Sequence, residues 1–271
     1  MNNKIFNTEK FSAESIADLK KQFDSAKPYR HLVIDNLLNN DFAETLLAHF
    51  PKKEDMRRHY EGLNEKKSEG SNFDVYHTSF TELRQAIASK EFTDFLTAVT
   101  GIQDLILPED FRGAGVHQGG DGSFLDIHVD FNIHPVLNLH RRLNFLLFLN
   151  KDWKYEYGGR LELWNEDVSV CEAEILPTFN RIVIFETSDV SYHGYDVISV
   201  PDGVFRNSFF AYFHTPIADK SKVKYHDTIF KPRPTDSGSK KVKTHAKETV
   251  KNLVKGAMRT LGITTFFKKF E

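Results

Sequence analysis

The chain has 271 residues, of which 40% are hydrophobic and 24 are phenylalanine, so we expect one large packed domain and exclude a disordered chain. A single cysteine, Cys171, excludes an intramolecular disulfide framework and a thiolate metal cluster, so nitrogen and oxygen atoms must hold any metal. The chain begins without the apolar stretch of a signal peptide, and its densest apolar run, residues 145–149, is too short to span a bilayer. We therefore expect a soluble, cytoplasmic protein.

The net charge of −2 is unevenly distributed along the chain. Residues 217–271 carry 14 Lys and Arg against 5 Asp and Glu, a balance of +9, which leaves 22 against 33, or −11, for residues 1–216. A stretch rich in proline and serine at residues 231–239 has the composition of a linker. These changes predict three parts: a mainly helical part over residues 1–110, a β-rich core over residues 111–216, and a basic linker with a C-terminal helix after it.

Helices dominate the elements predicted before residue 110. Apolar spacings of three and four predict helices over residues 12–27 and 41–50 and one or two more over residues 78–100, and a short strand is expected at residues 31–35. The polar segment between residues 60 and 77 is interpreted either as a plain surface loop or as a lid that orders on substrate binding.

From residue 111 onward, short runs of β-branched and aromatic residues alternate with glycine and polar pairs, a pattern typical of strands and their turns. Helices followed by short strands at hairpin spacing predict an α+β domain, with a jelly-roll sheet, N-terminal helices packed on that sheet, and a basic C-terminal helix. The expected strands cover residues 124–130, 143–149, 160–164, 181–185 and 205–213.

The triplet His128-Val129-Asp130 is the strongest chemical signal in the chain. In a strand, residues i and i+2 face the same way, so His128 and Asp130 can bind one ion from one side. His193 follows a further apolar strand and is a candidate third ligand. Two imidazoles and one carboxylate can hold a ferrous ion by one face and leave its other face open for chemistry.

The pattern alone leaves alternatives open. A His-x-Asp motif is common by chance, and a lone buried histidine is more often a hydrogen-bonded core residue than a metal ligand. Twelve histidines are present, and the spacing does not choose a third ligand among His193 and its competitors, which include His117, His134, His140, His214 and His226.

The sequence around the triplet resembles that of a known protein family. The run from residue 128 to 164 is HVDFNIHPVLNLHRRLNFLLFLNKDWKYEYGGRLELW, and it is followed by FETSDVSYHGY and PDGVFRNSFFAYF. These segments resemble the 2-oxoglutarate- and Fe(II)-dependent oxygenases of the prolyl 4-hydroxylase-like group. The resemblance implies a double-stranded β-helix, a jelly-roll catalytic core over residues 111–216. It also implies that His128, Asp130 and His193 are the iron ligands and that Arg206 binds the distal carboxylate of 2-oxoglutarate.

Two more residues are candidate contacts of 2-oxoglutarate. Ser208 lies two residues after Arg206 and faces the same way in a strand, so its hydroxyl could assist that carboxylate; otherwise it is an ordinary strand serine. The family often has a tyrosine where this chain has Phe148, which offers no hydroxyl. Asn144 lies four residues earlier on the same strand face and could supply an amide hydrogen bond instead, or could pair with the sheet backbone or water.

The resemblance implies an enzyme that uses Fe(II), 2-oxoglutarate and dioxygen. We expect it to hydroxylate an unactivated C–H bond of a small molecule, a carrier-bound intermediate or a peptide, with release of succinate and CO2. Asp130 favours hydroxylation, because related halogenases have a small residue at that position. The alternatives are a non-catalytic jelly-roll binding or sensing module and a cupin-type metal enzyme that does not use 2-oxoglutarate.

Substrate contacts are less well indicated. The glycine-rich segment over residues 111–123 is interpreted as a mobile loop near the mouth of the barrel, with His117 and Gln118 as candidate substrate contacts. A plain hairpin with a solvated histidine is the alternative.

The C-terminal segment has the pattern of a basic amphipathic helix. Its partner is a membrane surface, an acidic protein, or the acidic body of this same chain, and the body is slightly favoured because of its balance of −11. Nucleic-acid binding is not expected, because no recognition motif accompanies the charge. The apolar positions are Val242, Ala246, Val250, Leu253, Ala257 and Leu261, and the basic ones are Lys243, Lys247, Lys251 and Lys255.

Overall fold

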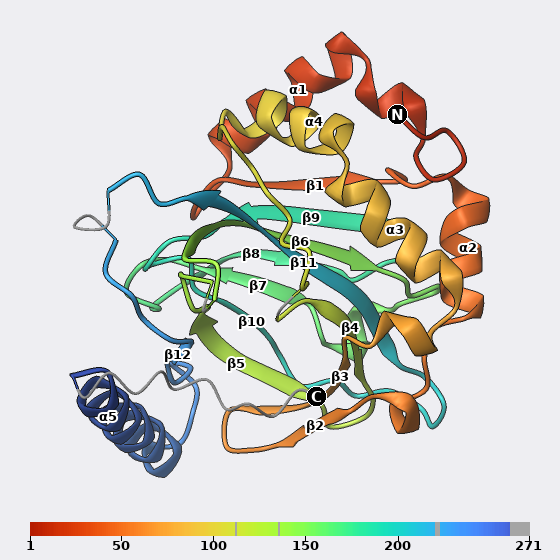
Figure 1. The fold of residues 1–271 in the computed structure, drawn as a ribbon. Helices are drawn as coiled ribbons and strands as arrows, with labels where there is room; N and C mark the ends of the chain where they lie inside the picture. Colours follow the sequence, from red (N-terminus) through yellow and green to blue (C-terminus); the bar gives the residue numbers. More distant parts are fainter. Residues whose placement is uncertain (112, 135, 220–222, 261–271) are drawn as a thin grey trace.

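The computed structural model describes residues 1–111, 113–134, 136–219 and 223–260. Its N-terminal region contains four α-helices, and a fifth lies near the C-terminus (Figure 1). The segment predicted as one or two helices over residues 78–100 is divided at Ser89, whose extended backbone ends one helix and whose hydroxyl accepts from the amide of Phe92 to begin the next. The helices are α1 (Ala13–Ser25), α2 (Asn40–Ala48), α3 (Thr78–Ala88), α4 (Lys90–Thr100) and α5 (Gly238–Thr260).

The strands form one antiparallel sheet in the order β1-β9-β6-β11-β4-β3-β5-β10-β7-β8, with β2 added to β3 and β12 to β5. The sheet curls so that its two halves face each other, as Figure 1 shows. The strands are β1 (His31–Asp35), β2 (Arg58–Glu61), β3 (Glu65–Gly70), β4 (Gly115–Gly119), β5 (Phe124–Val129), β6 (Leu139–Phe148), β7 (Leu161–Trp164), β8 (Cys171–Ile175), β9 (Arg181–Glu186), β10 (His193–Tyr195), β11 (Arg206–Pro216) and β12 (Ile229–Phe230).

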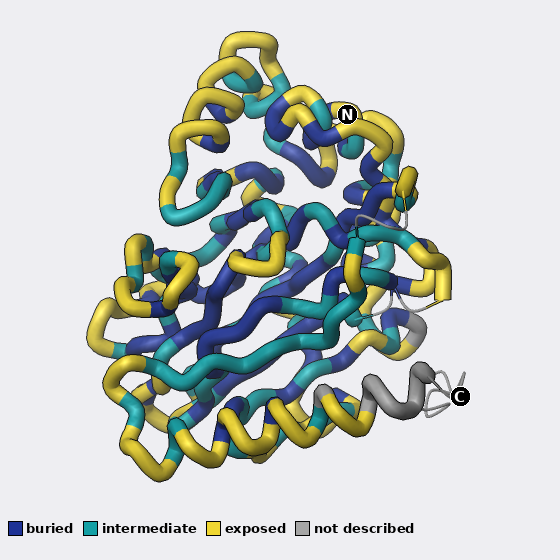
Figure 2. Tube along the Cα trace, turned by 90° about the vertical axis from the view of Figure 1, so that its left-hand side faces the viewer, coloured by how far each residue is buried: buried dark blue, intermediate teal, exposed yellow. Residues whose placement is uncertain are grey.

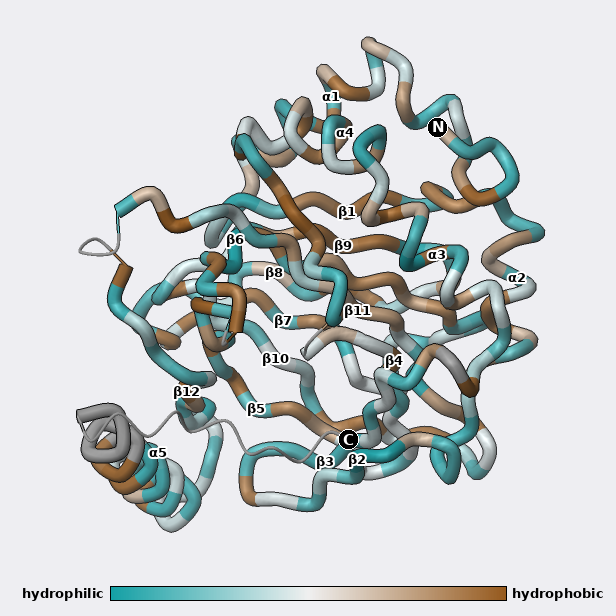
Figure 3. The backbone as a smooth tube through the Cα atoms, in the orientation of Figure 1, coloured by the Kyte–Doolittle hydropathy of each residue, from teal (hydrophilic) through white to brown (hydrophobic). Residues whose placement is uncertain are grey.

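The main hydrophobic core lies between the N-terminal helices and the outer face of the larger half of the sheet. Helix α4 contributes Phe92, which stacks on Phe6 and meets Phe145 of β6 and Phe213 of β11. Figure 2 shows the strands as the most buried part of the chain, and in Figure 3 the strands nearest the helices, β1 and β9, are strongly hydrophobic. In both orientations, α5 lies on the side of the barrel opposite these helices.

Two segments interpreted as loops are strands. The polar segment between residues 60 and 77 is not a lid, because it contains the end of β2 and all of β3, which pairs with both β4 and β5 and so joins the two halves of the sheet. Its charges are tolerated because Lys67 forms ion pairs with Glu65 (3.3 Å) and Glu69 (2.6 Å) on the same face of the strand. The glycine-rich segment 111–123 is not a mobile loop throughout, because its centre is β4, which is buried between β11 and β3.

The division of the chain at residues 110 and 216 stays a prediction. Strands β1 and β3, from the first part, lie in the same sheet as the strands of the second part. Among the described residues, no helix is both long and apolar enough to cross a membrane.

The contribution of the phenylalanine core to stability can be tested by mutation. Because Phe92 is fully buried among other aromatic rings, Phe92→Ala is expected to lower the free energy of unfolding by roughly 3–5 kcal/mol. Urea denaturation of the two proteins measures this change. Val75→Ala is the control, since Val75 is 65% exposed and its replacement is expected to stay within about 0.5 kcal/mol. Equal losses in both variants would contradict this account of the core.

Buried His214 predicts a pH dependence of stability. Burial, together with Arg141 and His134, lowers the pKa of His214 to about 3. The unfolded chain therefore takes up a proton as the pH falls below about 6.5, while the folded chain does not. Stability is expected to fall between about pH 6.5 and 3, by at most about 1.4 kcal/mol per pH unit from this group. Urea titrations of His214→Gln should show a shallower pH slope than wild type, and His245→Gln, at an exposed position, should keep the wild-type slope.

Candidate active site

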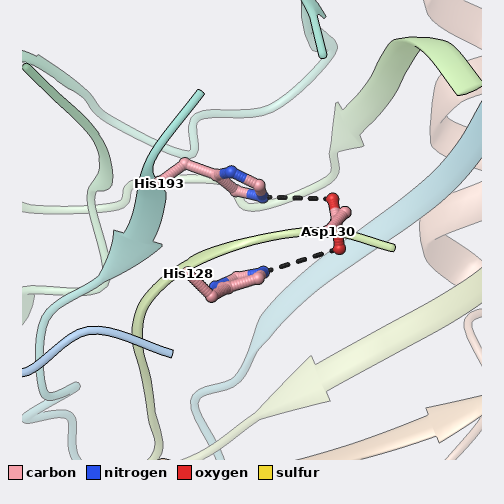
Figure 4. Close-up of side chains that lie close together, drawn as sticks. All are labelled: His128, Asp130 and His193. Carbon is pink, nitrogen blue, oxygen red and sulfur yellow. Dashed lines mark ion pairs between the residues drawn. The ribbon is translucent and has the colours of Figure 1, made fainter. Parts of the chain in front are cut away.

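Strand pairing brings the three predicted metal ligands together. His193 opens β10 directly opposite His128 of β5, and Asp130 follows the last residue of β5. The Nε2 atom of His128 lies 3.6 Å from Asp130 Oδ1, and Nε2 of His193 lies 3.4 Å from Asp130 Oδ2 (Figure 4). Among the described residues, this is the one group of three His, Cys, Asp or Glu side chains placed to hold a metal ion. The competing histidines of the sequence analysis, His117, His134, His140, His214 and His226, are not part of this group.

Both imidazoles are oriented by the backbone. His128 Nδ1 donates to the carbonyl of Asp126 (2.9 Å), and His193 Nδ1 donates to the carbonyl of Ser191 (3.0 Å). These bonds leave the Nε2 lone pairs directed at the space beside Asp130. Burial, and then the neighbouring His128, lower the pKa of His193, which keeps its ring neutral and able to bind a cation.

Asp130 is held by two further residues. Asn144 Nδ2 donates to Asp130 Oδ2 at 2.7 Å, and Arg141 NH1 lies 3.0 Å from the same oxygen. The guanidinium of Arg141 lies between the rings of Phe131 and Tyr212, at 3.9 and 3.5 Å from their centroids. Burial would raise the pKa of Asp130, but Arg141 and the two histidines hold it well below its usual range. The carboxylate is therefore ionised, as a hard divalent cation requires.

Arg206 lies in the same cavity, which has a volume of about 100 Å³. It is 3% exposed, and its Nε donates to the carbonyl of Gly159 (2.7 Å), where the backbone turns through a positive φ of 65°. None of the ion pairs among the described residues includes Arg206, because Asp196, the carboxylate whose charge acts on it, pairs with Arg160 (2.8 Å). Burial lowers the pKa of Arg206 to about 10. A buried guanidinium without an anion fits an anionic ligand such as a carboxylate.

Ser208, His117 and Tyr195 form a hydrogen-bonded chain beside Arg206. His117 Nδ1 lies 3.2 Å from Ser208 Oγ, and its Nε2 lies 3.1 Å from Tyr195 Oη. Burial, with the charges of Arg206 and Lys67, lowers the pKa of His117 well below its ordinary value, so the ring is neutral. A neutral imidazole donates one hydrogen bond and accepts one, so one of the two hydroxyls is left to donate into the cavity.

Of the remaining predicted site residues, Asn144 lines the cavity and Gln118 does not. Asn144 lines the cavity, but its amide nitrogen is on Asp130, and its contact with a co-substrate stays a prediction. Gln118 does not line this cavity; it faces the opposite side of β4, where it donates to Asn207 (2.9 Å). Sequence reasoning missed Tyr195, although it lies two residues after His193 and therefore faces the same way in the strand. It also missed Lys67 and Glu69, whose strand has no apolar pattern.

Part of the sequence is similar to known proteins. Residues 114–214 match the model of the 2OG-Fe(II) oxygenase superfamily. The protein named prolyl 3-hydroxylase OGFOD1 from Xenopus laevis is 26% identical over 205 residues, which are 69% of this chain and 35% of that protein. The mouse protein of the same name is 37% identical over 57 residues, 20% of this chain and 10% of the relative. The chain spans about a third of the length of the Xenopus relative.

Solved structures share the fold. A prolyl-4-hydroxylase from Pseudomonas putida has a TM-score of 0.53 and 16% identity, over 73% of this chain and 98% of that one. A prolyl hydroxylase from Trichoplax adhaerens, in complex with a hypoxia inducible factor peptide, has a TM-score of 0.51 and 14% identity, over 77% and 96% of the two chains. The predicted double-stranded β-helix is thereby confirmed. Residues 114–214, which include the three candidate metal ligands and Arg206, thus match a superfamily whose cofactors are Fe(II) and 2-oxoglutarate, and the fold of the chain is similar to that of prolyl 4-hydroxylases.

Proposed function

We propose that this protein is a 2-oxoglutarate-dependent hydroxylase, with iron held by His128, Asp130 and His193 and the distal carboxylate of 2-oxoglutarate held by Arg206. One observation carries the proposal: a two-histidine, one-carboxylate triad lines the same cavity as a buried guanidinium that has no carboxylate partner among the described residues. If the three side chains only stabilised the fold, the buried positive charge of Arg206 beside them would be an energetic cost without a function.

The bound iron and 2-oxoglutarate supply the oxidation, in which dioxygen is consumed, 2-oxoglutarate becomes succinate and CO2, and one oxygen atom enters a substrate C–H bond. The protein's own groups bind and orient these reactants. Arg206 offers a bidentate contact to a carboxylate, and its guanidinium lies 4.8 Å from the ring centroid of Phe148 and 4.4 Å from that of Tyr195. These rings limit the directions in which the guanidinium can turn.

The family often has a tyrosine hydroxyl where this chain has Phe148, and we assign its role to a hydroxyl of Tyr195 or Ser208. Tyr195 and Ser208 share one neutral histidine, His117, and the hydroxyl left free donates to the carboxylate that Arg206 binds. His117 is therefore assigned to the co-substrate pocket rather than to substrate recognition. Asn144 is assigned to Asp130, whose carboxylate it keeps in one orientation.

A prolyl residue in a peptide is the first substrate class to test, because two curated relatives are named prolyl 3-hydroxylases. The wall of the cavity formed by Lys67 and Glu69 on β3 offers both a donor and an acceptor to a peptide backbone. Small molecules and carrier-bound intermediates remain in the proposal as further classes. A binding module without turnover, and a cupin-type enzyme without 2-oxoglutarate, are less well supported, since neither uses the unpaired Arg206.

Succinate release tests the reaction class. The iron-loaded protein is expected to form succinate only when 2-oxoglutarate and dioxygen are both present, and peptide or metabolite pools should gain one oxygen atom by mass spectrometry. His193→Ala removes one of three metal ligands and is expected to abolish both signals. Gln118→Ala, on the opposite face of β4, is the matched control and should retain them. Activity of His193→Ala equal to wild type would refute the ligand assignment.

Arg206→Gln separates co-substrate binding from metal binding. Loss of the buried charge opposite a carboxylate costs about 2 kcal/mol or more, so the KM for 2-oxoglutarate is expected to rise by roughly 30-fold or more. Co(II) affinity, measured by calorimetry without 2-oxoglutarate, should stay near the wild-type value. An unchanged KM would contradict the assignment of Arg206.

A further inference from the structure

The metal-binding strand has an edge that β3 does not cover. Strand β10 pairs with one edge of β5. On the other edge, β3 pairs with Phe124 and Leu125, and the amide of Asp126 donates to the carbonyl of Asn64 (2.8 Å). The pairing with β3 ends there, two residues before His128. An uncovered edge would leave the backbone groups of the ligand residues to water and free to move.

Residues 224–251, here called the C-terminal strap, cover this edge. Strand β12 pairs with His128 and Val129, and the amide of Lys231 donates to the carbonyl of Ile127 (2.8 Å). Beyond the triplet, Asn132 Nδ2 donates to the carbonyl of Lys224 (2.8 Å). The backbone amide of Asn132 also donates to the carbonyl of His226 (3.4 Å), so the strap binds the backbone on both sides of Asp130.

Phe230 of the strap also contacts a metal ligand through its side chain. Its ring centroid lies 5.4 Å from that of His128, at an interplanar angle of 37°. Lys247 of α5 lies with its Nζ 5.4 Å from the centroid of Phe230. His128 is thus confined by the carbonyl of Asp126 at Nδ1, by the ring of His193 (4.3 Å between centroids), and by Phe230.

Buried charges hold the strap on the barrel. Asp126 is 1% exposed and forms an ion pair with Lys240 (2.9 Å), and buried Glu162 forms one with Arg233. Detachment of the strap would cost both buried carboxylates these ion pairs, and loss of one partner of a buried pair is strongly destabilising. The barrel also binds α5 through Asn64, which donates to Thr244 Oγ1 (3.0 Å) and accepts from Lys247 Nζ (3.0 Å). The polar face of α5 therefore faces the barrel.

We propose that the C-terminal strap is part of the metal site, and that Phe230 is a positioning residue that fixes the imidazole of His128 for the ion. The proposal rests on the metal ligands proposed above and extends the site to Phe230, which lies 102 residues after His128 in the sequence. Metal affinity then depends on the packing of the strap against β5, although the strap contributes no metal ligand.

Co(II) binding to the full chain tests this role without any need for turnover. Phe230→Ala is expected to weaken Co(II) binding by about 10- to 100-fold, the usual effect of losing a group that orients a ligand, and to alter the visible absorption of the bound Co(II). Phe230→Tyr keeps the ring and should restore both the affinity and the spectrum. The matched control is Leu253→Ala, because Leu253 is 68% exposed on the outer face of α5 and its loss should change neither.

The outcomes separate the two proposals. If wild-type protein does not bind Co(II), the metal site itself is refuted. If wild type binds but Phe230→Ala has the same affinity and spectrum, the positioning role is refuted and the metal site stands. If Phe230→Ala does not fold, Phe230→Leu, which keeps an apolar contact without the ring, is expected to bind Co(II) with an intermediate loss. Wild-type affinity in that variant would equally refute the positioning role.

Discussion

The antiparallel pairing of β10 with β5 is the contact on which the active site depends. It sets His193 opposite His128, so that two imidazoles from segments 65 residues apart in sequence direct their Nε2 atoms to one side of Asp130. A shift of one residue in this register would turn the side chain of His193 to the other face of the sheet. The curled sheet, with β3 joining its two halves, keeps β5 and β10 in this register.

Some buried charges that line the cavity have an oppositely charged side chain as a partner, and one does not. Asp130 has Arg141, and Lys67 has two glutamates, which raise its pKa above the ordinary value although burial opposes them. Arg206 has no such partner among the described residues. In the proposed function this imbalance favours binding of the dianionic co-substrate, because its carboxylate would meet a desolvated cation that no carboxylate among the described residues already pairs with.

The elements predicted with success are those whose side chains face a hydrophobic core. Helices at residues 12–27 and 78–100 and the strands around Phe145 and Ile184 have apolar residues at helical or alternating spacing. Strand β3 has no such pattern, because one of its faces borders the cavity, where Lys67 and its glutamate partners replace apolar residues. The glycine-rich β4 was likewise interpreted as a loop. Both errors concern strands that line the site, where chemistry rather than packing selects the residues.

By itself, the sequence determined the local part of the site: a strand with period two places His128 and Asp130 on one face, and the motifs around them resemble one oxygenase family. Spacing alone did not choose among the twelve histidines, and the resemblance implied His193, which strand pairing sets opposite His128. The use of Asn144 to hold Asp130 and the sharing of His117 by two hydroxyls were decided by tertiary structure alone. The reason is physical. Side-chain periodicity is a local property of the backbone, whereas partners far apart in sequence are set by how the sheet closes and by which buried charges must be paired.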